Sequence, residues 1–246
     1  MRLDRLLSNS GYGTRSEVRD LIRSGRIEVN GQAAKDPSVN VDTGKGDVVS
    51  LDRAPVRLSR YLYIALYKPD GYLTALEDKR LPTVADLLPQ EFLFQGVSPV
   101  GRLDFHTTGL LLLTNDGTLS HRLTSPKWHA DKVYRVTFEG NPIGVEEIQL
   151  FRSGMSLCDK ETTPELLAPA SVEILDSITC LLTLTEGKTH QVKRMFAAVR
   201  RPVIALHRES VGGILLREDQ KPGEWRQLDE VEIRRLYQVA GMENQK

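Results

Sequence analysis

The sequence predicts an α+β protein in two unequal parts. A small N-terminal α/β module of helices and a hairpin is followed by a larger, mainly antiparallel mixed sheet with flanking helices. Predicted strands outnumber predicted helices, and most successive strands lie close together in the chain, which favours antiparallel pairing. A short, polar, proline-containing segment, residues 53–60, separates the two parts as a linker. With 246 residues, 40% of them hydrophobic and 27% charged, the chain is long enough for one large domain or two unequal ones.

The first part, residues 1–52, contains the segment TRSEVRDLIRSGRIEVNG. Thr14 and Glu17 have the spacing of a capping box, and the apolar residues at 18, 21 and 22 give one helical stripe. Gly25 is suited to end this helix. The letters RIEVNG then alternate like a strand and finish in Asn-Gly, which is a strong hairpin signal. The segment therefore predicts a helix followed by a hairpin.

The same segment carries a row of arginines. Arg15, Arg19 and Arg23 recur every fourth residue on one helical face, and Arg26 opens the strand. Evenly spaced guanidinium groups suit a phosphate backbone, but such a row is also typical of a solvated face, and two neighbouring acids can partly neutralise it. The whole chain has 33 basic and 33 acidic residues, which argues against a uniformly basic nucleic-acid binder. Charge alone leaves both interpretations of the arginine row open.

The second part, residues 61–246, mixes strand and helix patterns. Strands are predicted at YLYIALYKP (61–69), which a Lys-Pro-Asp-Gly turn closes, and at KVYRVTF (132–138), SVEIL (171–175) and ITCLLTLT (178–185). Amphipathic helices are predicted at QVKRMFAAV (191–199) and at EVEIRRLYQV (230–239), the second capped by Asp229. Because the strands are close in sequence, a doubly wound parallel sheet is disfavoured.

Several classes of protein are excluded by simple patterns. The longest pure apolar run, residues 110–113, is far shorter than the roughly 18 residues that span a bilayer, and the first residues lack a signal-peptide core. Cys158 and Cys180 fit a reducing compartment and have no metal-ligand spacing, so we expect inert thiols, no disulfide framework and no metal site. The sequence predicts a cytoplasmic protein.

The stretch GRLDFHTTGLLLLTNDG, residues 101–117, places Asp104 directly before a leucine run that is expected to be buried. An aspartate near the start of a strand is usually a turn former or a helix cap, because its side chain bonds nearby backbone amides. The spacing alone does not separate that structural role from a functional one.

This stretch resembles the signature of the pseudouridine synthases, in which the aspartate of GRLD is the catalytic nucleophile. The motifs KPDGY, SHRLTSPKWHADKVYRV, EGKTHQVKRMFAAV and LHRESVGGI stand in the family's order, and residues 2 to about 50 resemble the S4 RNA-binding domain. The branch most similar is the one represented by ribosomal small subunit pseudouridine synthase A. The resemblance implies isomerisation of uridine in 16S ribosomal RNA, free or in a small-subunit assembly intermediate, by a monomer without a cofactor.

The resemblance also implies site residues. Asp104 would add to the sugar at C1′, add to the base at C6, or take a sugar proton; the three routes stay open. Because desolvation disfavours a charged carboxylate, a cation must lie close to Asp104. Lys193 matches the position of this cation in the family. Arg194 is the alternative for this role and is also expected to contact RNA. Tyr134 matches the tyrosine that stacks on the target base, although its strand pattern also suits a core residue. Arg102 would replace the flipped base or hold a flanking phosphate.

Some alternatives remain open at this stage. His106 stands where the small-subunit branch is expected to carry an acid, so the role of this position is open. The rival functions are the same reaction on 23S ribosomal RNA, a non-catalytic S4-type RNA-binding protein, and a glycosidase. Glycosidases usually need two carboxylates about 5 to 9 Å apart, whereas these motifs supply one acid. The sequence does not name the target uridine.

Overall fold

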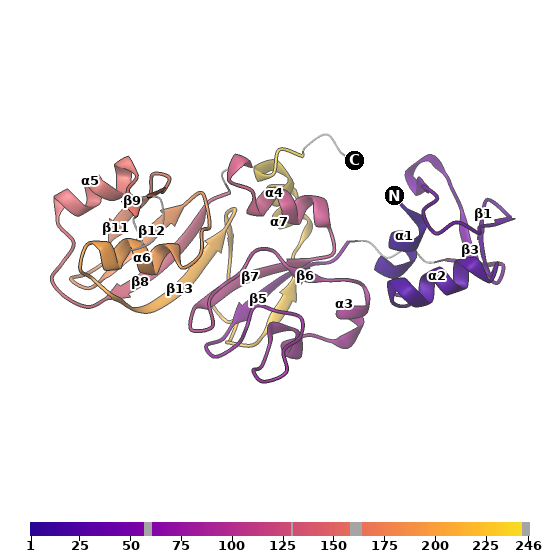
Figure 1. Cartoon of the computed structure of the whole chain (residues 1–246), viewed down its shortest axis with the longest axis horizontal. Coiled ribbons are helices and arrows are strands. Elements are labelled where there is room, and N and C mark those ends of the chain that lie inside the picture. The colour runs from indigo at the N-terminus through magenta and orange to yellow at the C-terminus, as the bar shows by residue number, and fades with distance from the viewer. Residues whose placement is uncertain (57–60, 129, 158–163, 243–246) are drawn as a thin grey trace. The chain divides into compact units, whose positions relative to one another are not determined.

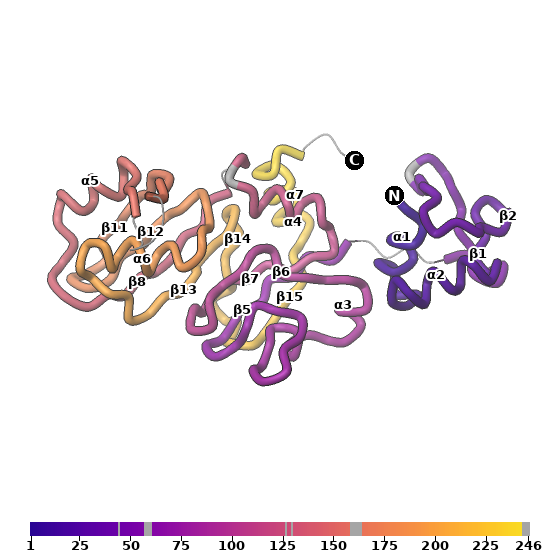
Figure 2. The backbone as a smooth tube through the Cα atoms, viewed as in Figure 1, coloured from indigo at the N-terminus to yellow at the C-terminus, as the bar shows by residue number. Residues whose placement is uncertain are grey.

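The structure is a computed structural model that describes residues 1–56, 61–128, 130–157 and 164–242. The chain divides into two compact units: residues 1–62 with 88–98 and 114–116 form the first, and residues 63–87, 99–113 and 117–246 form the second. The order of the elements can be followed in Figures 1 and 2. Among the described residues, no helix is long and apolar enough to cross a membrane.

The N-terminal module consists of two helices and a small sheet. Helix α2 begins with the predicted capping box: Glu17 N donates to Thr14 Oγ1 (3.3 Å), and Thr14 N donates to Glu17 Oε2 (2.7 Å). The predicted hairpin turn is present at Asn30 and Gly31, which both have positive φ, 53° and 79°. The elements are α1 (Leu3–Asn9), α2 (Arg15–Arg23), β1 (Ile27–Val29), β2 (Gln32–Ala33), η1 (Thr43–Lys45), β3 (Val49–Leu51) and β4 (Ala54–Pro55), with sheet order β2-β1-β3-β4.

The predicted linker, residues 53–60, needs a correction at its start. Asp52 and Arg53 both adopt left-handed backbone conformations (φ 50° and 67°) and turn the chain back, so that β4 pairs with β3. The N-terminal sheet therefore extends to Pro55, and residues 57–60 lie outside the described residues. The core of this module comes from apolar residues of both helices and of the sheet, including Leu3, Leu7 and Ile22.

The second unit is built on a mixed, mostly antiparallel sheet with strand order β11-β12-β8-β13-β7-β5-β15. Strand β13 pairs antiparallel with β8 along one edge and parallel with β7 along the other, so it joins the two halves of the sheet (Figure 1). The predicted strands and helices are confirmed as β5 (Tyr63–Lys68), β8 (Lys132–Phe138), β11 (Ser171–Ile174), β12 (Thr179–Leu184), α6 (Gln191–Ala198) and α7 (Glu230–Val239). The additional long strands are β7 (Thr108–Thr114) and β13 (Val203–Val211).

The leucine run lies in β7, and residues 110–113 are buried, as the sequence predicts. Gly109 is required where β7 meets β13: its φ is +108°, and a Cβ added there would lie 2.3 Å from the carbonyl oxygen of Arg208. Helices α4 (Gly117–Thr124) and α7 lie side by side and cover this part of the sheet (Figure 1), contributing Leu119, Leu123 and Leu236 to its core.

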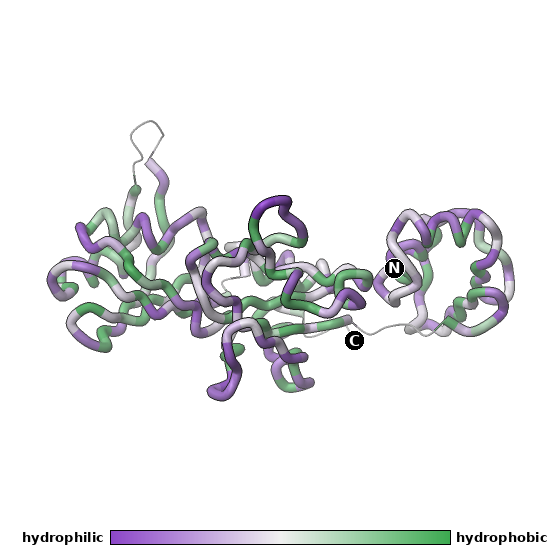
Figure 3. The backbone as a smooth tube through the Cα atoms, turned by 90° about the horizontal axis from the view of Figure 1, so that it is seen from below, coloured by the Kyte–Doolittle hydropathy of each residue, from purple (hydrophilic) through white to green (hydrophobic). Residues whose placement is uncertain are grey.

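The remaining elements are short: η2 (Val84–Leu87), α3 (Gln90–Phe94), β6 (Ser98–Pro99), η3 (Pro126–Trp128), α5 (Val145–Ser153), β9 (Ser156–Leu157), β10 (Glu165–Leu166), β14 (Ile214–Leu215) and β15 (Trp225–Gln227). Figure 3 shows apolar residues concentrated along the strands and hydrophilic residues in the connecting loops. Cys180 is buried, and burial raises the pKa of its thiol to about 12, so it stays protonated and inert. Cys158 lies outside the described residues.

Candidate active site

A small pocket, with a cavity volume of about 70 Å³, opens beside the amino end of β7. Its walls come from the turn before β7, from the strands β8, β12 and β13, and from the loop that leads into α6. The lining residues are Arg102, Leu103, Asp104, Thr107, Tyr134, Leu184, Gly187, Lys188, His190, Gln191, Val192, Lys193 and Leu206.

Asp104 lies at this pocket with an ammonium group and an imidazole ring beside it. The Nζ of Lys193 is 3.5 Å from Asp104 Oδ2, and Nε2 of His190 is 3.6 Å from Oδ1. The Asp104 side chain is 28% exposed, so its carboxylate is only partly solvated. Both partners belong to the start of α6, where the helix dipole also favours a negative charge. The structure thus brings together Asp104 and Lys193, as expected from the family position.

The sequence interpretation missed His190. Its backbone φ is 49°, a left-handed conformation that non-glycine residues seldom adopt and in which histidine is enriched. The residue lies within the quoted motif EGKTHQVKRM, but no spacing rule connects it with Asp104. Only the folding of the 185–190 loop against the turn before β7 places the two side chains together.

The turn that carries Asp104 is held on both sides by residues 68–74, which begin with the KPDGY motif. Before the acid, Leu103 exchanges two hydrogen bonds with Thr74: Thr74 Oγ1 donates to the Leu103 carbonyl (2.7 Å) and accepts from Leu103 N (3.2 Å). After the acid, Lys68 Nζ donates to the carbonyl oxygens of Phe105 (3.1 Å) and Thr107 (2.8 Å). The KPDGY motif thus holds the turn after the carboxylate, and Thr74, two residues beyond the motif, holds it before the carboxylate.

The same segment contacts the turn at two further points. Gly71 N donates to the Phe105 carbonyl (3.1 Å), and His106 Nδ1 lies 3.0 Å from Asp70 Oδ1 at an exposed position. The hydrogen bond from His106 is the main cause that lowers the pKa of the Asp70 carboxyl. His106 therefore faces Asp70, and it does not line the pocket.

Three cations are buried next to the pocket. Lys68 is fully buried, and burial lowers its pKa to about 8, as it does for Lys132 at the start of β8. Arg208 on β13 is also buried; its Nε donates to the Leu110 carbonyl (2.7 Å), and its Cζ lies 6.0 Å from the centroid of the Tyr134 ring. Tyr134 itself is only 8% exposed yet lines the pocket, so it is both a core residue and part of the pocket wall.

A buried carboxylate shapes the loop that presents His190 and Lys193. Glu186 accepts hydrogen bonds from Ala168 N (2.9 Å) and from Gln191 Nε2 (2.8 Å), and Gln191 Oε1 in turn accepts from Lys188 N (3.0 Å). This network fixes the backbone from residue 186 to the first turn of α6. These hydrogen bonds explain how an exposed loop can hold the side chains of His190 and Lys193 in position beside Asp104.

The other two sequence candidates near the pocket differ in their contacts. Arg194 was the alternative partner expected for Asp104, but its Nη1 lies 2.7 Å from Glu165 Oε2, and the structure brings Lys193 to Asp104 instead. Adjacent helix positions differ by about 100° in direction, which separates their partners. Arg102 is exposed and lines the pocket two residues before Asp104.

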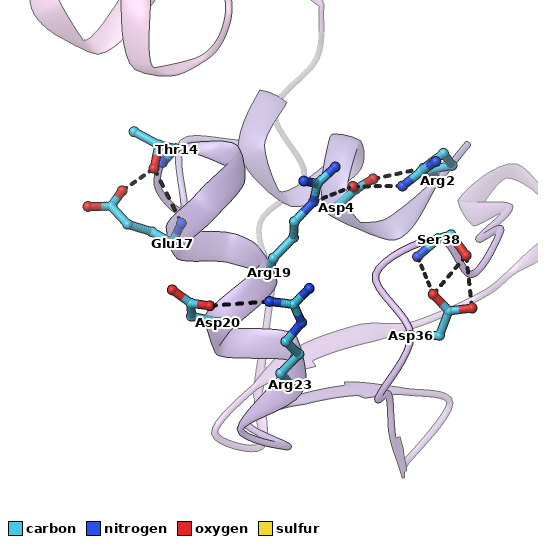
Figure 4. Close-up of polar contacts among 9 residues, drawn as sticks. All are labelled: Arg2, Asp4, Thr14, Glu17, Arg19, Asp20, Arg23, Asp36 and Ser38. Atoms are coloured by element: carbon cyan, nitrogen blue, oxygen red, sulfur yellow. Dashed lines mark hydrogen bonds and ion pairs between the residues drawn. The ribbon is translucent and has the colours of Figure 1, made fainter.

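In the N-terminal module, part of the arginine row is engaged within the protein (Figure 4). Arg19 Nε lies 3.2 Å from Oδ2 of the buried Asp4, and Arg23 Nη1 lies 3.8 Å from Asp20 Oδ1. Burial alone would raise the pKa of Asp4, but hydrogen bonds from Arg2 and Arg19 hold it below its usual value.

The remaining two arginines also differ from each other. Arg26 forms a two-pronged ion pair with Asp52. Arg15 forms no ion pair with the part of the chain that the structure describes, and it is exposed. Glu17, one of the two acids expected to neutralise the row, serves the capping box with Thr14 (Figure 4).

Comparison with known proteins identifies the family. The sequence profile described as RNA pseudouridylate synthase matches residues 62–198, and that of the S4 domain matches residues 1–49. The chain belongs to the RNA pseudouridylate synthase family. It is 42% identical to an uncharacterized RNA pseudouridine synthase of Bacillus subtilis over 96% of this chain and 98% of the relative.

Two further relatives of this RNA pseudouridylate synthase have more specific names. Ribosomal small subunit pseudouridine synthase A of Vibrio cholerae is 40% identical over 96% of this chain and 100% of the relative, and that of Escherichia coli is 37% identical over 95% and 98%. The crystal structure of a pseudouridylate synthase is also similar: its sequence is 36% identical, and the TM-score is 0.66 over 96% of this chain and 99% of the other. The predicted fold class and enzyme class are confirmed.

The pocket of this synthase offers carboxylate, ammonium, imidazole and phenol groups around one small space. Among the described residues, no cluster of three or more histidine, cysteine or acidic side chains is arranged to hold a metal ion. The arrangement can present one carboxylate with adjacent cations to a substrate that enters beside Tyr134.

Proposed function

We propose that this protein converts a uridine of 16S ribosomal RNA into pseudouridine, with Asp104 as the nucleophile. The observation that carries the proposal is the partly solvated Asp104 carboxylate at the pocket, 3.5 Å from Lys193 and 3.6 Å from His190. The target RNA rests on the relatives named ribosomal small subunit pseudouridine synthase A, which match along almost the whole chain.

The reaction itself is an isomerisation. The bond between C1′ and N1 breaks, the uracil turns within the site, and C5 bonds to C1′; C5 loses a proton and N1 gains one, so that the atoms balance without an oxidant or a group donor. Asp104 assists by adding to C1′, by adding to C6, or by taking and returning a sugar proton. In each route the carboxylate must be ionised and fixed, which the ammonium of Lys193 and the rigid turn support.

The substrate uridine must leave its stack to reach Asp104, at a cost of a few kcal/mol. In our proposal the uracil ring enters beside Tyr134, which offers an aromatic face in the pocket wall. Arg102 and Arg194 contact the flanking phosphates or take the space that the base leaves. In the N-terminal module, Arg15, Arg19, Arg23 and Arg26 supply further phosphate contacts. Because ribosomal RNA is the proposed substrate, we place the protein in the cytoplasm and expect it to act as a monomer.

The decisive test replaces Asp104 with asparagine, which removes the nucleophile and keeps the shape. Release of tritium from 16S transcripts labelled with [5-³H]uridine should fall to less than about a hundredth of the wild-type rate, with nearly unchanged RNA affinity. Asp219→Asn is the matched control, because Asp219 is exposed and does not line the pocket; it should retain the wild-type rate.

The target is tested separately. Carbodiimide-dependent stops of reverse transcription, mapped in ribosomal RNA from cells with and without the gene, should show one 16S position that depends on the protein. A dependent position in 23S ribosomal RNA would contradict the proposed target, and full turnover by the Asp104→Asn protein would contradict the proposed nucleophile.

A further inference from the structure

One buried hydroxyl at the pocket has no hydrogen-bond partner among the described residues. Thr107 lines the pocket and is only 1% exposed, and its Oγ1 is buried with no hydrogen-bond partner in the part of the chain that the structure describes. A buried hydroxyl without a partner costs about 1 to 3 kcal/mol, and native proteins seldom leave one unsatisfied. Its position suggests that the partner arrives with the molecule that fills the pocket.

The contrast with the next residue is informative. Thr108 Oγ1 lies 2.9 Å from Nδ1 of His207 on the neighbouring strand β13, so its hydroxyl serves the fold. The hydroxyl of Thr107 has no such structural use among the described residues. Two adjacent threonines thus provide a natural comparison between a satisfied and an unsatisfied side chain.

The backbone of Thr107 is held by hydrogen bonds in the same turn as Asp104. Its backbone N–H donates to the Asp104 carbonyl (3.0 Å), and its carbonyl accepts from Lys68 Nζ (2.8 Å). Asp104 and Thr107 are therefore the two ends of one tight turn. A substrate that reaches the carboxylate also comes within reach of this turn.

The surroundings indicate which part of the substrate the hydroxyl contacts. Among the residues that line the pocket, Leu184 is buried and apolar like Leu206, and Tyr134 adds an aromatic face. The side chains of Lys193 and His190 are 38% and 61% exposed, and their N–H groups suit an anionic phosphate. A neutral hydroxyl among apolar groups suits a neutral, flat ring with a few polar atoms. The uracil ring fits this description, whereas the phosphate and the ribose fit the charged rim.

We propose that the Thr107 hydroxyl is a substrate-binding group that donates a hydrogen bond to a carbonyl oxygen of the target uracil. The inference rests on the proposed function. When the C1′–N1 bond breaks, the electron pair goes to the base, and the negative charge spreads over the ring onto the carbonyl oxygens. A donor held on a rigid turn stabilises this charge in the transition state more than it stabilises the neutral ground state. Thr107 therefore contributes to the chemical step as well as to placing the base.

The test compares Thr107→Val, which is nearly isosteric and lacks the hydroxyl, with Thr107→Ser, which keeps it. At saturating 16S transcript, the single-turnover rate of tritium release from [5-³H]uridine should fall at least about tenfold in Thr107→Val and stay near the wild-type rate in Thr107→Ser. The Kd for the transcript should hardly change in either variant. The melting temperature of Thr107→Val should be unchanged or higher, because the variant removes an unsatisfied buried group.

Thr108→Val is the structural control and should lower the melting temperature, because it breaks the contact with His207. A Thr107→Val rate within about twofold of wild type would overturn the inference, since a donor to developing charge is worth more than that. A fall in melting temperature as large as that of Thr108→Val would overturn it as well, because it would assign the hydroxyl a structural partner. Absence of tritium release by the wild-type protein would instead refute the proposed function.

Discussion

Lys68→Met is the perturbation that best tests how the catalytic turn is held. The buried ammonium of Lys68 donates to three carbonyl oxygens, those of Pro69 (3.1 Å), Phe105 (3.1 Å) and Thr107 (2.8 Å). Methionine keeps most of the apolar stem and removes the three donors together with the charge. The variant should affect both the stability of the second unit and the position of Asp104.

The magnitude follows from the lowered pKa of Lys68. A fall from 10.5 to about 8 corresponds to roughly 3 kcal/mol, which is the net cost of keeping the charged form in the folded protein: burial is its main cause, and the carboxylates of Asp70 and Asp104 reduce it. This cost applies in full below pH 8. As the pH rises from 8 to 10.5, the folded state loses the proton while the unfolded state keeps it, so the free energy of unfolding rises. Between pH 7 and pH 10, the free energy of unfolding of the wild type should rise by about 2 to 3 kcal/mol relative to that of Lys68→Met.

The assay is urea unfolding followed by tryptophan fluorescence at several pH values. Both tryptophans of the chain, Trp128 and Trp225, lie in the second unit, so the signal reports on the unit that contains Lys68. The single-turnover rate at pH 7 should also fall at least about tenfold in Lys68→Met, because a catalytic group displaced by about 1 Å can cost a factor of 100.

Lys132→Met is the matched control. The ammonium of Lys132 is buried too, and burial lowers its pKa to about 8, but it donates to the Ala130 carbonyl and not to the turn of Asp104. This variant should flatten the pH dependence of stability by a similar amount and reduce the rate far less. The reasoning is refuted if the stability difference between wild type and Lys68→Met stays constant from pH 7 to pH 10, or if both lysine variants reduce the rate equally.

Two further predictions concern charged side chains. Lys193→Met should lower the single-turnover rate steeply, because it removes the ammonium beside Asp104. Arg194→Met breaks the ion pair with Glu165 and should mainly weaken RNA binding. Equal rate losses in the two variants would contradict the assignment of Lys193 as the partner of Asp104. Arg15→Gln should reduce the slope of the logarithm of RNA affinity against the logarithm of salt concentration by about 1, without loss of stability. Arg19→Gln should destabilise the N-terminal module, because it removes a partner of the buried Asp4 carboxylate. An unchanged slope for Arg15→Gln would indicate that the arginine row is a solvated face.

Local chemistry explains what the sequence predicted well. The capping boxes at Thr14 and Asp229 and the Asn30-Gly31 turn depend on residues within three positions of each other, and each is present. The strand and helix patterns of the second part are likewise read from neighbouring residues. The short linker was misjudged at its start, because Asp52 and Arg53 take left-handed conformations that neither residue type signals clearly.

The parts of the site that depend on distant contacts were not predictable in the same way. Lys68 reaches carbonyl groups 37 and 39 residues further along the chain, and His190 meets Asp104 across 86 positions. No periodicity encodes such contacts, since they arise when β5 lies beside β7 and when β13 pairs with both β7 and β8. The resemblance to a family supplied Lys193, because a family motif carries positions that folding brings together.

The distribution of charge gives the physical reason for an acid at the edge of a core. The chain is neutral overall, with 33 basic and 33 acidic residues. Around the pocket, however, Lys68, Lys132 and Arg208 are buried, and Lys193 lies beside Asp104. Buried cations are costly unless negative charge lies near them, and a partly desolvated carboxylate is costly unless positive charge lies near it. The negative charge of Asp104 and the positive charges around it therefore reduce each other's desolvation cost. The same local excess of positive charge also favours the negative charge that a departing uracil carries, so the groups that stabilise the ionised acid also assist the bond cleavage that we propose for it.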